Sequence, residues 1–556
     1  MLEPAHILRS EKLANRLSEN PVWLTSVVAC IWIVSGLIGH DPWKSEEAIL
    51  TGQLFLLKTS IGSFPFSAIF SGELNNYPIF SWISLTIESV TSSVMPFHDG
   101  IRLSMGIWLL LTTIFVSRAA GELWGAVASW AAPLVLMGSV GLLVKGHQLS
   151  LTTPFLAAMS IGLYALAIAP RRSIVGGIWL GIALVSTILL SRIEYLVLIL
   201  TITVTMIGLS PRYRSRRFGI TFLTALFVAL LSLAAFTVLL LGTGGSQTLF
   251  YWVNLQVESL THIFVPTQSP DHAYLLRTFF WFCWPGWIFC IWSLWSEGKT
   301  GLEKKELQLP LISLVVTILF LCVRGSNSEI ENSLVLLPIA LLASIAVSRL
   351  PRGIANSFYW FSIMSGIAFV FIAWVYFSAS YFGVPTRLFE HLSRLHPLYV
   401  SQDHTWKILV ATMVGIIWLG LLFNIKRIPA RPILIWTLTF TMGWLTAVIL
   451  LFSWIDSRKT YKPVISDLVK HVSPEHNCVI TQVGPAQKGL IEYFGRLRTS
   501  AVYMDNESNK CDYLIVQDSW DSEEKIGSPW MLVWEGGRSG DKGERFQLFR
   551  KQESRP

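Results

Sequence analysis

The stretch PVWLTSVVACIWIVSGLIG, residues 21–39, runs directly into HDPWKSEE, residues 40–47. The first part is apolar and about long enough to cross a hydrocarbon core of ~30 Å. The second part holds three carboxylates, Asp41, Glu46 and Glu47, grouped around Trp43. Carboxylates at the point where a chain leaves a membrane can act as a base beside a lipid-borne substrate. The simpler alternative is a set of solvated loop charges.

The composition indicates an integral membrane protein with many spans. Hydrophobic residues make up 52% of the 556 residues and charged residues 14%, whereas soluble chains carry about 25% charged residues. The 24 tryptophans suit interfacial belts. The net charge of +8 does not indicate nucleic-acid binding, because the basic residues lie in short loops between apolar runs. The first run lacks a small-residue cleavage site, which predicts an uncleaved anchor.

A hydropathy window of ~20 residues predicts about thirteen transmembrane helices within a membrane domain over residues 1–455. The expected spans are 22–39, 101–117, 122–143, 149–169, 174–190, 193–209, 218–241, 276–296, 310–323, 333–348, 356–378, 406–424 and 433–455. Basic residues gather in every second loop, for example at Arg171, Arg212 and Arg349. Because positive loops face the cytoplasm, we expect a bacterial inner-membrane protein with a cytoplasmic N-terminus and a periplasmic C-terminal domain.

Four segments on the expected outer side are long. Residues 40–100 contain amphipathic pieces and predict short helices lying in the membrane interface. Residues 242–275 and 379–405 are predicted outer loops. Residues 456–556 are polar and predict a small α/β domain, with a helix over 461–471 and strands over 478–480, 513–516, 531–534 and 545–549.

Two of the six cysteines, Cys478 and Cys511, lie in this outer tail. In an oxidising periplasm they can form a disulfide. They can equally remain two separate buried thiols, because the sequence does not show whether their Cα atoms approach each other.

The order of these features is similar to that of a known family of membrane enzymes. An acidic pair after the first span, a long outer loop, about thirteen spans and an outer tail resemble the GT-C membrane glycosyltransferases. The closest resemblance is to the bacterial branch (families 39 and 83) related to lipid A aminoarabinose transferase and the protein O-mannosyltransferases. Local motifs add to it, namely residues 46–48, 78–82, 102–103, 147–149, 331–338, 534–536 and 544–546.

The resemblance implies a reaction on the periplasmic face. A sugar is transferred from a polyprenyl-phosphate donor to an envelope acceptor, which can be lipid A, a polysaccharide or a protein. An acidic residue of the first outer loop serves as base or orients the acceptor. Glu46 is our first choice for this catalytic carboxylate, with Asp41 as the alternative and Glu47 as its neighbour. Partial desolvation at a membrane interface raises the pKa and the basicity of such a group.

The lipid phosphate needs cationic partners, and the candidates lie near outer ends of spans. The predicted substrate-binding residues are Lys58, Trp82, His147, Arg192, Arg277 and Arg324, and Lys145 is a further cation. Each cation can instead be an interfacial anchor, and Arg192 can pair with Glu194 at a tight turn. The chain departs from the family where Asn75 and Asn76 replace a lysine of some relatives, and where Thr152 replaces an acid.

Other sites and functions are less well indicated. His262, Asp271 and His272 have the side chains of a divalent-cation site, although their spacing matches no defined site and solvated loop residues are the simpler reading. We therefore predict no required metal, with a divalent cation as an option. No phosphate-binding loop or dinucleotide turn is present. A flippase for a lipid-linked saccharide and a catalytically degenerate envelope-assembly scaffold remain the alternatives to a transferase.

Overall fold

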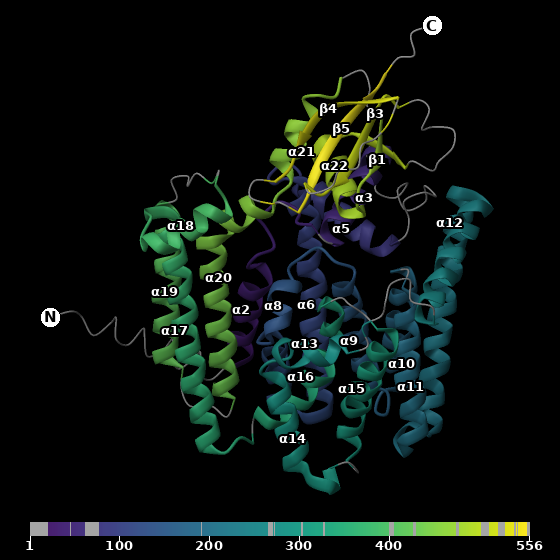
Figure 1. The fold of residues 1–556 in the computed structure, drawn as a ribbon. Helices are drawn as coiled ribbons and strands as arrows, with labels where there is room; N and C mark the ends of the chain where they lie inside the picture. The colour runs from purple at the N-terminus through teal and green to yellow at the C-terminus, as the bar shows by residue number, and fades with distance from the viewer. Residues whose placement is uncertain are drawn as a thin grey trace, which may run out of the picture.

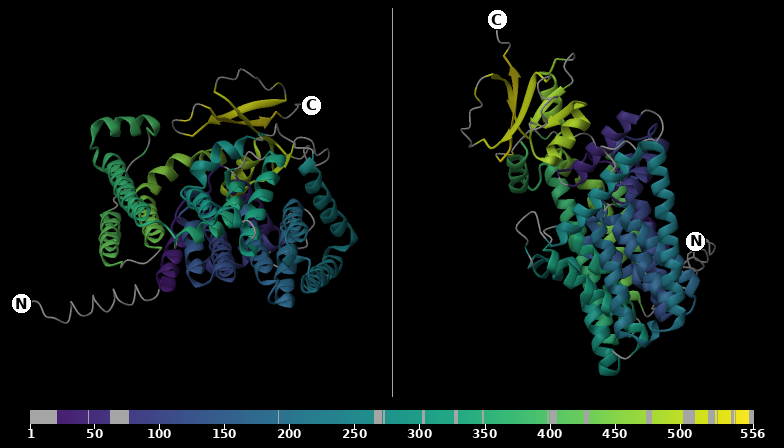
Figure 2. Two further views of the ribbon diagram at one scale, coloured as in Figure 1. Left: turned by 90° about the horizontal axis from the view of Figure 1, so that it is seen from below. Right: turned by 90° about the vertical axis from the view of Figure 1, so that its right-hand side faces the viewer.

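The protein is a helical bundle with a small mixed sheet set over one end (Figures 1 and 2). The computed structural model describes residues 21–44, 46–61, 77–190, 192–264, 271, 273–301, 304–325, 329–347, 349–397, 399, 405–425, 430–473, 478–501, 511–520, 527, 529–538, 541 and 543–552. The helices of this bundle follow from the apolar runs of the chain, because apolar runs long enough to cross a membrane form helices there.

Each predicted span coincides with an apolar helix or with a pair of helices. The bundle consists of α2 (Pro21–Val34), α6 (Phe97–Trp124), α7 (Ala126–Met137), α8 (Val140–Lys145), α9 (Thr152–Ile168), α10 (Ser173–Leu189), α11 (Ile193–Leu209), α12 (Arg216–Phe264), α13 (Tyr274–Phe282), α14 (Gly286–Gly301), α15 (Lys305–Arg324), α16 (Ser333–Val347), α17 (Arg352–Phe382), α19 (Thr405–Asn424) and α20 (Arg431–Lys459). Among the described residues, seven helices are long and apolar enough to cross a membrane, or eight with one bent pair. The count of thirteen stays a prediction, because other predicted spans are apolar helices of 10–17 residues.

The core lies around α9 and α16, which are buried along their whole length. A helix that is apolar on all sides is stable only when other helices surround it. The few polar side chains inside it bond to backbone carbonyls, as Ser160 does to Ala157. By contrast, α12 and α17 expose many large apolar side chains, as helices in contact with lipid do. The bundle therefore has a protein-buried centre and an apolar periphery.

Three predicted boundaries were wrong. Helix α12 continues past residue 241 to Phe264, with a break at Gly245 (φ 72°), so much of the expected loop 242–275 is helical. The expected span 276–296 is a pair, α13 and α14, bent by 90° just before Gly286, because Pro285 has no N–H with which to continue a helix. The expected span 122–143 is divided at Gly125 (φ 86°) and Gly138. A hydropathy profile reports the length of an apolar run, but it does not show where the helix within that run is interrupted.

Short helices lie at the end of the bundle that carries the sheet (Figure 1). They are α3 (Glu46–Ile61), α5 (Pro78–Thr91) and α18 (Thr386–Leu395), which agrees with the short helices expected in the first outer loop. Helices α17 and α20 begin next to basic residues and run toward this end. The basic residues at these two helix starts lie at the end away from the sheet, while the charge asymmetry of the loops and the orientation in a membrane remain predictions.

The C-terminal domain contains a five-stranded sheet of order β2-β1-β3-β5-β4. Its elements are α21 (Lys462–Val469), β1 (Cys478–Gln482), α22 (Pro485–Gly495), β2 (Arg498–Ala501), β3 (Tyr513–Asp518), β4 (Trp530–Gly536) and β5 (Arg545–Lys551). Strand β1 pairs in parallel with β2 and β3, and β5 pairs antiparallel with β3 and β4. The four predicted strands match β1, β3, β4 and β5, whereas α22 and β2 were not predicted.

The domain is joined tightly to the first outer loop through α3 and α22. A Cβ atom added to Gly52 would lie 2.3 Å from the Cα atom of Gly489. The two helices therefore touch backbone to backbone, which only glycine permits at such a distance. Ala48 of α3 belongs to the same apolar cluster as Leu490 and Ile491 of α22. The start of α3, where the acidic pair lies, is consequently held by the C-terminal domain.

Cys478 and Cys511 form a disulfide across a separation of 33 residues. We expect that replacing both cysteines with serine lowers the stability of the C-terminal domain by about 2–4 kcal/mol, because the unfolded loop is no longer constrained. Limited proteolysis of the full chain in detergent measures this loss, and Cys30→Ser, an exposed free cysteine, is the control. Peptide mapping without reductant that finds both thiols free would contradict the assignment.

Candidate active site

The loop between α2 and α3 carries Asp41, and the first turn of α3 carries Glu46 and Glu47, and the three carboxylates lie in different surroundings. Glu47 and Asp99 both bind Arg102, which is 1% exposed. The Arg102 Nε atom lies 2.7 Å from Glu47 Oε1, and its Nη1 atom lies 2.7 Å from Asp99 Oδ1. The backbone carbonyls of Leu37 and His40 accept further bonds at 3.2 Å. This Arg102 cluster (Glu47, Asp99 and Arg102) closes the loop onto α6.

Asp41 belongs to a contact between the loop and the end of α20. Thr460 donates a hydrogen bond of 2.8 Å to Asp41, and Asp456 accepts bonds of 2.9 Å from the Asp41 backbone N–H and from the Trp43 indole. His98 Nε2 lies 3.8 Å from Asp41 Oδ1. Asp41 therefore links α2 to the helix that leads into the C-terminal domain.

His98 extends this link into the C-terminal domain. Its Nδ1 atom lies 2.8 Å from the hydroxyl of Tyr493 on α22. Burial raises the pKa of Tyr493 to about 12, and burial lowers the pKa of His40 to about 4. At neutral pH the Tyr493 hydroxyl keeps its proton and His40 is uncharged. Neither group supplies a titratable acid or base near pH 7.

Glu46 points into a second group of charges. Its carboxylate accepts a hydrogen bond of 3.1 Å from the Leu151 backbone N–H, just before α9. Arg192, between α10 and α11, and Glu331, just before α16, act on it electrostatically. We call Glu46, Arg192, Glu194, Arg324 and Glu331 the Glu46 cluster. Its members come from four places in the chain, since Arg192 and Glu194 lie two residues apart, so only the tertiary fold brings them together.

The two arginines of the Glu46 cluster share the same two carboxylates. Arg324 lies 2.9 Å from Glu331 and 3.6 Å from Glu194. Arg192 lies 3.8 Å from Glu331 and 3.5 Å from Glu194. Tyr195 accepts a bond of 3.0 Å from Arg324 and packs its ring against the guanidinium. Two positive charges are thus held side by side where each would otherwise repel the other.

Burial raises the pKa of Glu46, and the positive charge of Arg192 opposes that rise. A carboxylate with a raised pKa is a stronger base than an ordinary one once it is ionised. Tyr77, just before α5, is half-buried; partial burial raises its pKa, and Arg192 and Glu46 act on it electrostatically. The Glu46 cluster therefore combines three carboxylates with two guanidiniums, and the protonated phenol of Tyr77 lies within electrostatic reach of it.

The structure brings only some of the predicted residues together. Arg192 acts on Glu46 electrostatically, and Arg324 belongs to the same group through Glu194 and Glu331. Lys58 pairs with Glu88 of α5 at 2.6 Å, and Arg277 forms a solvent-exposed ion pair with Asp271.

The two predicted aromatic residues have different surroundings. His147 is buried, with its Nε2 atom 2.7 Å from the backbone carbonyl of Trp32 and its Nδ1 atom against that of Leu143. These contacts give His147 a packing role between α2 and α8. Trp82 is 38% exposed on α5.

The candidate metal residues do not form a cluster in the part of the chain that is described. Asp271 pairs with Arg277, and the side chains of His262 and His272 lie outside the described residues, as do Asn75 and Asn76. No group of three or more metal-ligating side chains occurs among the described residues.

The pairing of Arg192 with Glu194, one of the alternatives from the sequence, is present at 3.5 Å. Sequence reasoning missed Glu331 as a partner of both arginines. Glu331 opens one of the motifs that carried the resemblance, yet its position in the chain does not show that it meets Arg192 or Arg324. Lys145 lies beside this site through its ion pair of 3.0 Å with Glu329.

Comparison with known proteins shows the fold. No family model matches the chain, and no curated protein matches it in sequence. The solved structure of ArnT from Cupriavidus metallidurans bound to undecaprenyl phosphate aligns with a TM-score of 0.68 at 13% identity, over 97% of this chain and 99% of that one. The apo state of that protein aligns with a TM-score of 0.61 at 15% identity, over 95% and 97%. The predicted fold, a GT-C-like membrane bundle with a small C-terminal α/β domain, is confirmed in outline.

Proposed function

We propose that this protein is a membrane glycosyltransferase that takes a sugar from a polyprenyl-phosphate donor and transfers it to an envelope acceptor. The observation that carries the proposal is the Glu46 cluster, where Arg192 acts on a carboxylate with a raised pKa and shares two further carboxylates with Arg324. Its fold is that of a protein solved with undecaprenyl phosphate bound. A polyprenyl phosphate needs cations, and an acceptor hydroxyl needs a base.

In the proposed reaction Glu46 takes the proton of the acceptor hydroxyl. The acceptor oxygen bonds to the anomeric carbon of the sugar while the bond from that carbon to the phosphate oxygen breaks. The electron pair of the broken bond leaves with the polyprenyl phosphate. Arg192 and Arg324 stabilise that charge, since a guanidinium has five N–H donors and keeps some free for a phosphate while bonded to Glu194 and Glu331.

Asp41 and Glu47 have structural roles in this proposal. Glu47 accepts bonds from Arg102 and from the Trp43 backbone, and Asp41 is engaged with Thr460. A base must be able to reach the substrate proton. Asp41 and Glu47 hold the loop in place, and they could reach that proton only by giving up the bonds that hold the loop. Glu46 is accordingly the only one of the three carboxylates to which we assign a catalytic role.

We further propose that the C-terminal domain lies in the periplasm and the N-terminus in the cytoplasm. Support comes from the basic residues at the starts of α17 and α20, far from the sheet, and from the disulfide, which an oxidising compartment maintains. The acceptor, whether lipid A, a polysaccharide or a protein, is not specified by these features.

Loss of the protein from its source cells tests the function. We expect one modified envelope species to disappear and its polyprenyl-linked donor to accumulate, as measured by mass spectrometry of extracted lipids and glycans. An unchanged profile would favour a scaffold. Transport of a lipid-linked saccharide by the protein in sealed vesicles, without any acceptor, would favour a flippase.

Arg192→Gln tests the electrostatics of the site. The charge of Arg192 lowers the pKa of Glu46, so its removal raises that pKa further. Because the base works only when ionised, the acid limb of the pH profile of transfer moves to higher pH. Rates measured across pH check this, with Arg171→Gln, an exposed arginine paired with Glu122, as the control. If the acid limb of the pH profile does not move in Arg192→Gln, the charge of Arg192 does not act on the catalytic base, and the proposed link between Arg192 and Glu46 is wrong.

A further inference from the structure

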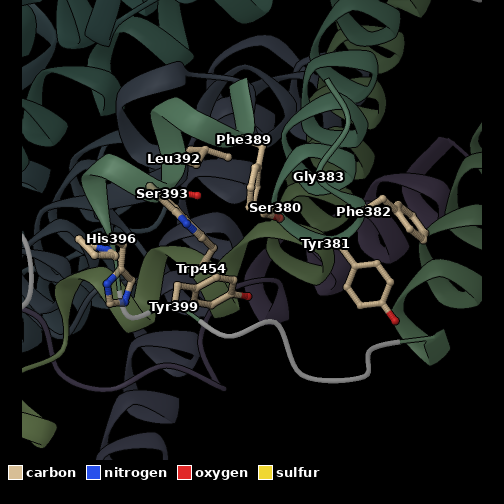
Figure 3. A pocket seen from close by; sticks show the side chains of 11 residues that line it. Ser380, Tyr381, Phe382, Gly383, Phe389, Leu392, Ser393, His396, Tyr399 and Trp454 are labelled. Carbon is tan, nitrogen blue, oxygen red and sulfur yellow. The ribbon is translucent and has the colours of Figure 1, made fainter. Parts of the chain in front are cut away.

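A cavity of about 490 Å³ lies at the sheet-bearing end of the bundle, apart from the Glu46 cluster. It is formed by the end of α17, by α18, by the segment after α18 and by the last turns of α20 (Figure 3). This size suits a small ligand, since ligand pockets measure about 300–1,000 Å³.

Aromatic rings form much of the cavity wall. Tyr381 and Phe382 come from the end of α17, Phe389 from α18 and Trp454 from α20. Tyr399 lies beside His396, with ring centroids 5.8 Å apart. Figure 3 shows the rings of Tyr399 and His396 on one side of the view and Tyr381 and Phe382 on the other. Such rings provide flat apolar faces in a site that also contains polar atoms.

The polar part of the cavity centres on His396. This residue is 9% exposed, and its Nδ1 atom is buried with no hydrogen-bond partner among the described residues. Burial lowers the pKa of His396, so the ring is neutral near pH 7 and one nitrogen can accept a hydrogen bond. Ser393 also lines the cavity. A buried polar atom without a partner is costly, so a ligand with hydroxyl groups fits this cavity better than an acyl chain.

We propose that this cavity binds a saccharide unit, whose ring lies against the aromatic wall and whose hydroxyl donates to His396. A sugar ring has both apolar C–H faces and hydroxyl edges, which match the two kinds of wall. An acyl chain would leave Nδ1 of His396 without a hydrogen-bond donor.

The position of the cavity indicates which saccharide it holds. Trp454 precedes Asp456 by two residues on α20, and Asp456 bonds to the loop of Asp41 and Trp43 that leads to Glu46. The cavity and this loop therefore lie at the same end of the bundle, on opposite faces of α20, because residues two apart on a helix do not share a face. We assign it to a sugar unit of the acceptor glycan, and this role, unlike saccharide binding itself, rests on the proposed function.

Binding is tested on the full chain in lipid nanodiscs by saturation-transfer NMR. The probes are methyl glycosides and disaccharides of glucose, galactose, mannose and N-acetylglucosamine. We expect saturable binding of at least one probe, weakened about tenfold or more by His396→Ala and by Trp454→Leu. Trp454→Phe keeps an aromatic face, so it is expected to bind the probe more tightly than Trp454→Leu does. His396→Asn keeps a hydrogen-bond acceptor, so it is expected to bind more tightly than His396→Ala does. His391→Ala, exposed on α18 outside the cavity, leaves binding unchanged.

Three outcomes would overturn the inference in whole or in part. Absence of saturable binding of every probe removes the saccharide site. A co-purified phospholipid that Trp454→Leu releases makes it a lipid site. An unchanged KM for the acceptor in His396→Ala, with probe binding lost, removes only the acceptor role. If the wild-type protein binds a probe but has no transferase activity, the proposed function is rejected while the saccharide-binding site is still supported.

Discussion

Glu46→Gln lowers sugar transfer by about 10²–10⁴-fold, the usual contribution of a general base. Glutamine has the size and hydrogen-bonding oxygen of glutamate, so the bond from the Leu151 backbone N–H is kept and the fold persists. Only the ability to take a proton is lost. Transfer is measured with purified protein in detergent, a polyprenyl-phosphate sugar and extracted envelope lipids, and thermal unfolding confirms that the variant is folded.

Two variants make this result specific. Glu122→Gln removes a carboxylate from the exposed pair with Arg171 and is expected to leave transfer unchanged. Glu46→Asp keeps the charge but shortens the side chain by one methylene, so partial activity is expected. Full activity in Glu46→Gln would show that another group is the base and would remove the central support of the proposed mechanism.

Arg102→Met destabilises the protein by about 3–5 kcal/mol, because it leaves the buried carboxylates of Glu47 and Asp99 without their partner. Arg102 also bonds to two backbone carbonyls of the loop, so the loop loses its attachment to α6. We expect a lower unfolding temperature of the purified full chain and, because the same loop leads to Glu46, a lower transfer rate in the protein that remains folded.

Arg118→Met is the matched control, since Arg118 is exposed on the same helix, α6. Arg102→Lys keeps the charge but loses the fork that reaches two carboxylates, so we expect an intermediate loss. Combining Arg102→Met with Glu47→Gln should restore part of the stability, because one unpaired charge is removed. Equal unfolding temperatures for Arg102→Met and Arg118→Met would refute the structural role of the Arg102 cluster.

Much of the fold was predictable because membrane spans are encoded locally. A run such as residues 333–348 predicts a helix by its length and apolarity, whatever surrounds it. The strands at residues 478–480 and 513–516 were likewise visible as short buried runs. The breaks at Gly125, Gly245 and Pro285 were not predicted, because residues on both sides of each break are apolar and hydropathy does not change there.

The candidate site was only partly predictable. The acidic loop after the first span was recognised from local order, and Arg192 and Arg324 were chosen for their places near ends of spans. The choice among Asp41, Glu46 and Glu47 needed their partners, which lie far away in the chain. Lys58 and Arg277 had the same local signal as Arg192, yet their charges are paired elsewhere.

By itself the chain determined a many-helix membrane bundle, an acidic loop after the first anchor and a separate polar C-terminal domain. These are properties of local composition, because a helix in lipid satisfies its own backbone and needs no distant partner to form. Tertiary structure alone decided which carboxylate is held by Arg102, which one is acted on by Arg192, and that a cavity opens beside α20. Burial and charge pairing depend on residues that are distant in the chain, so no local pattern could specify them.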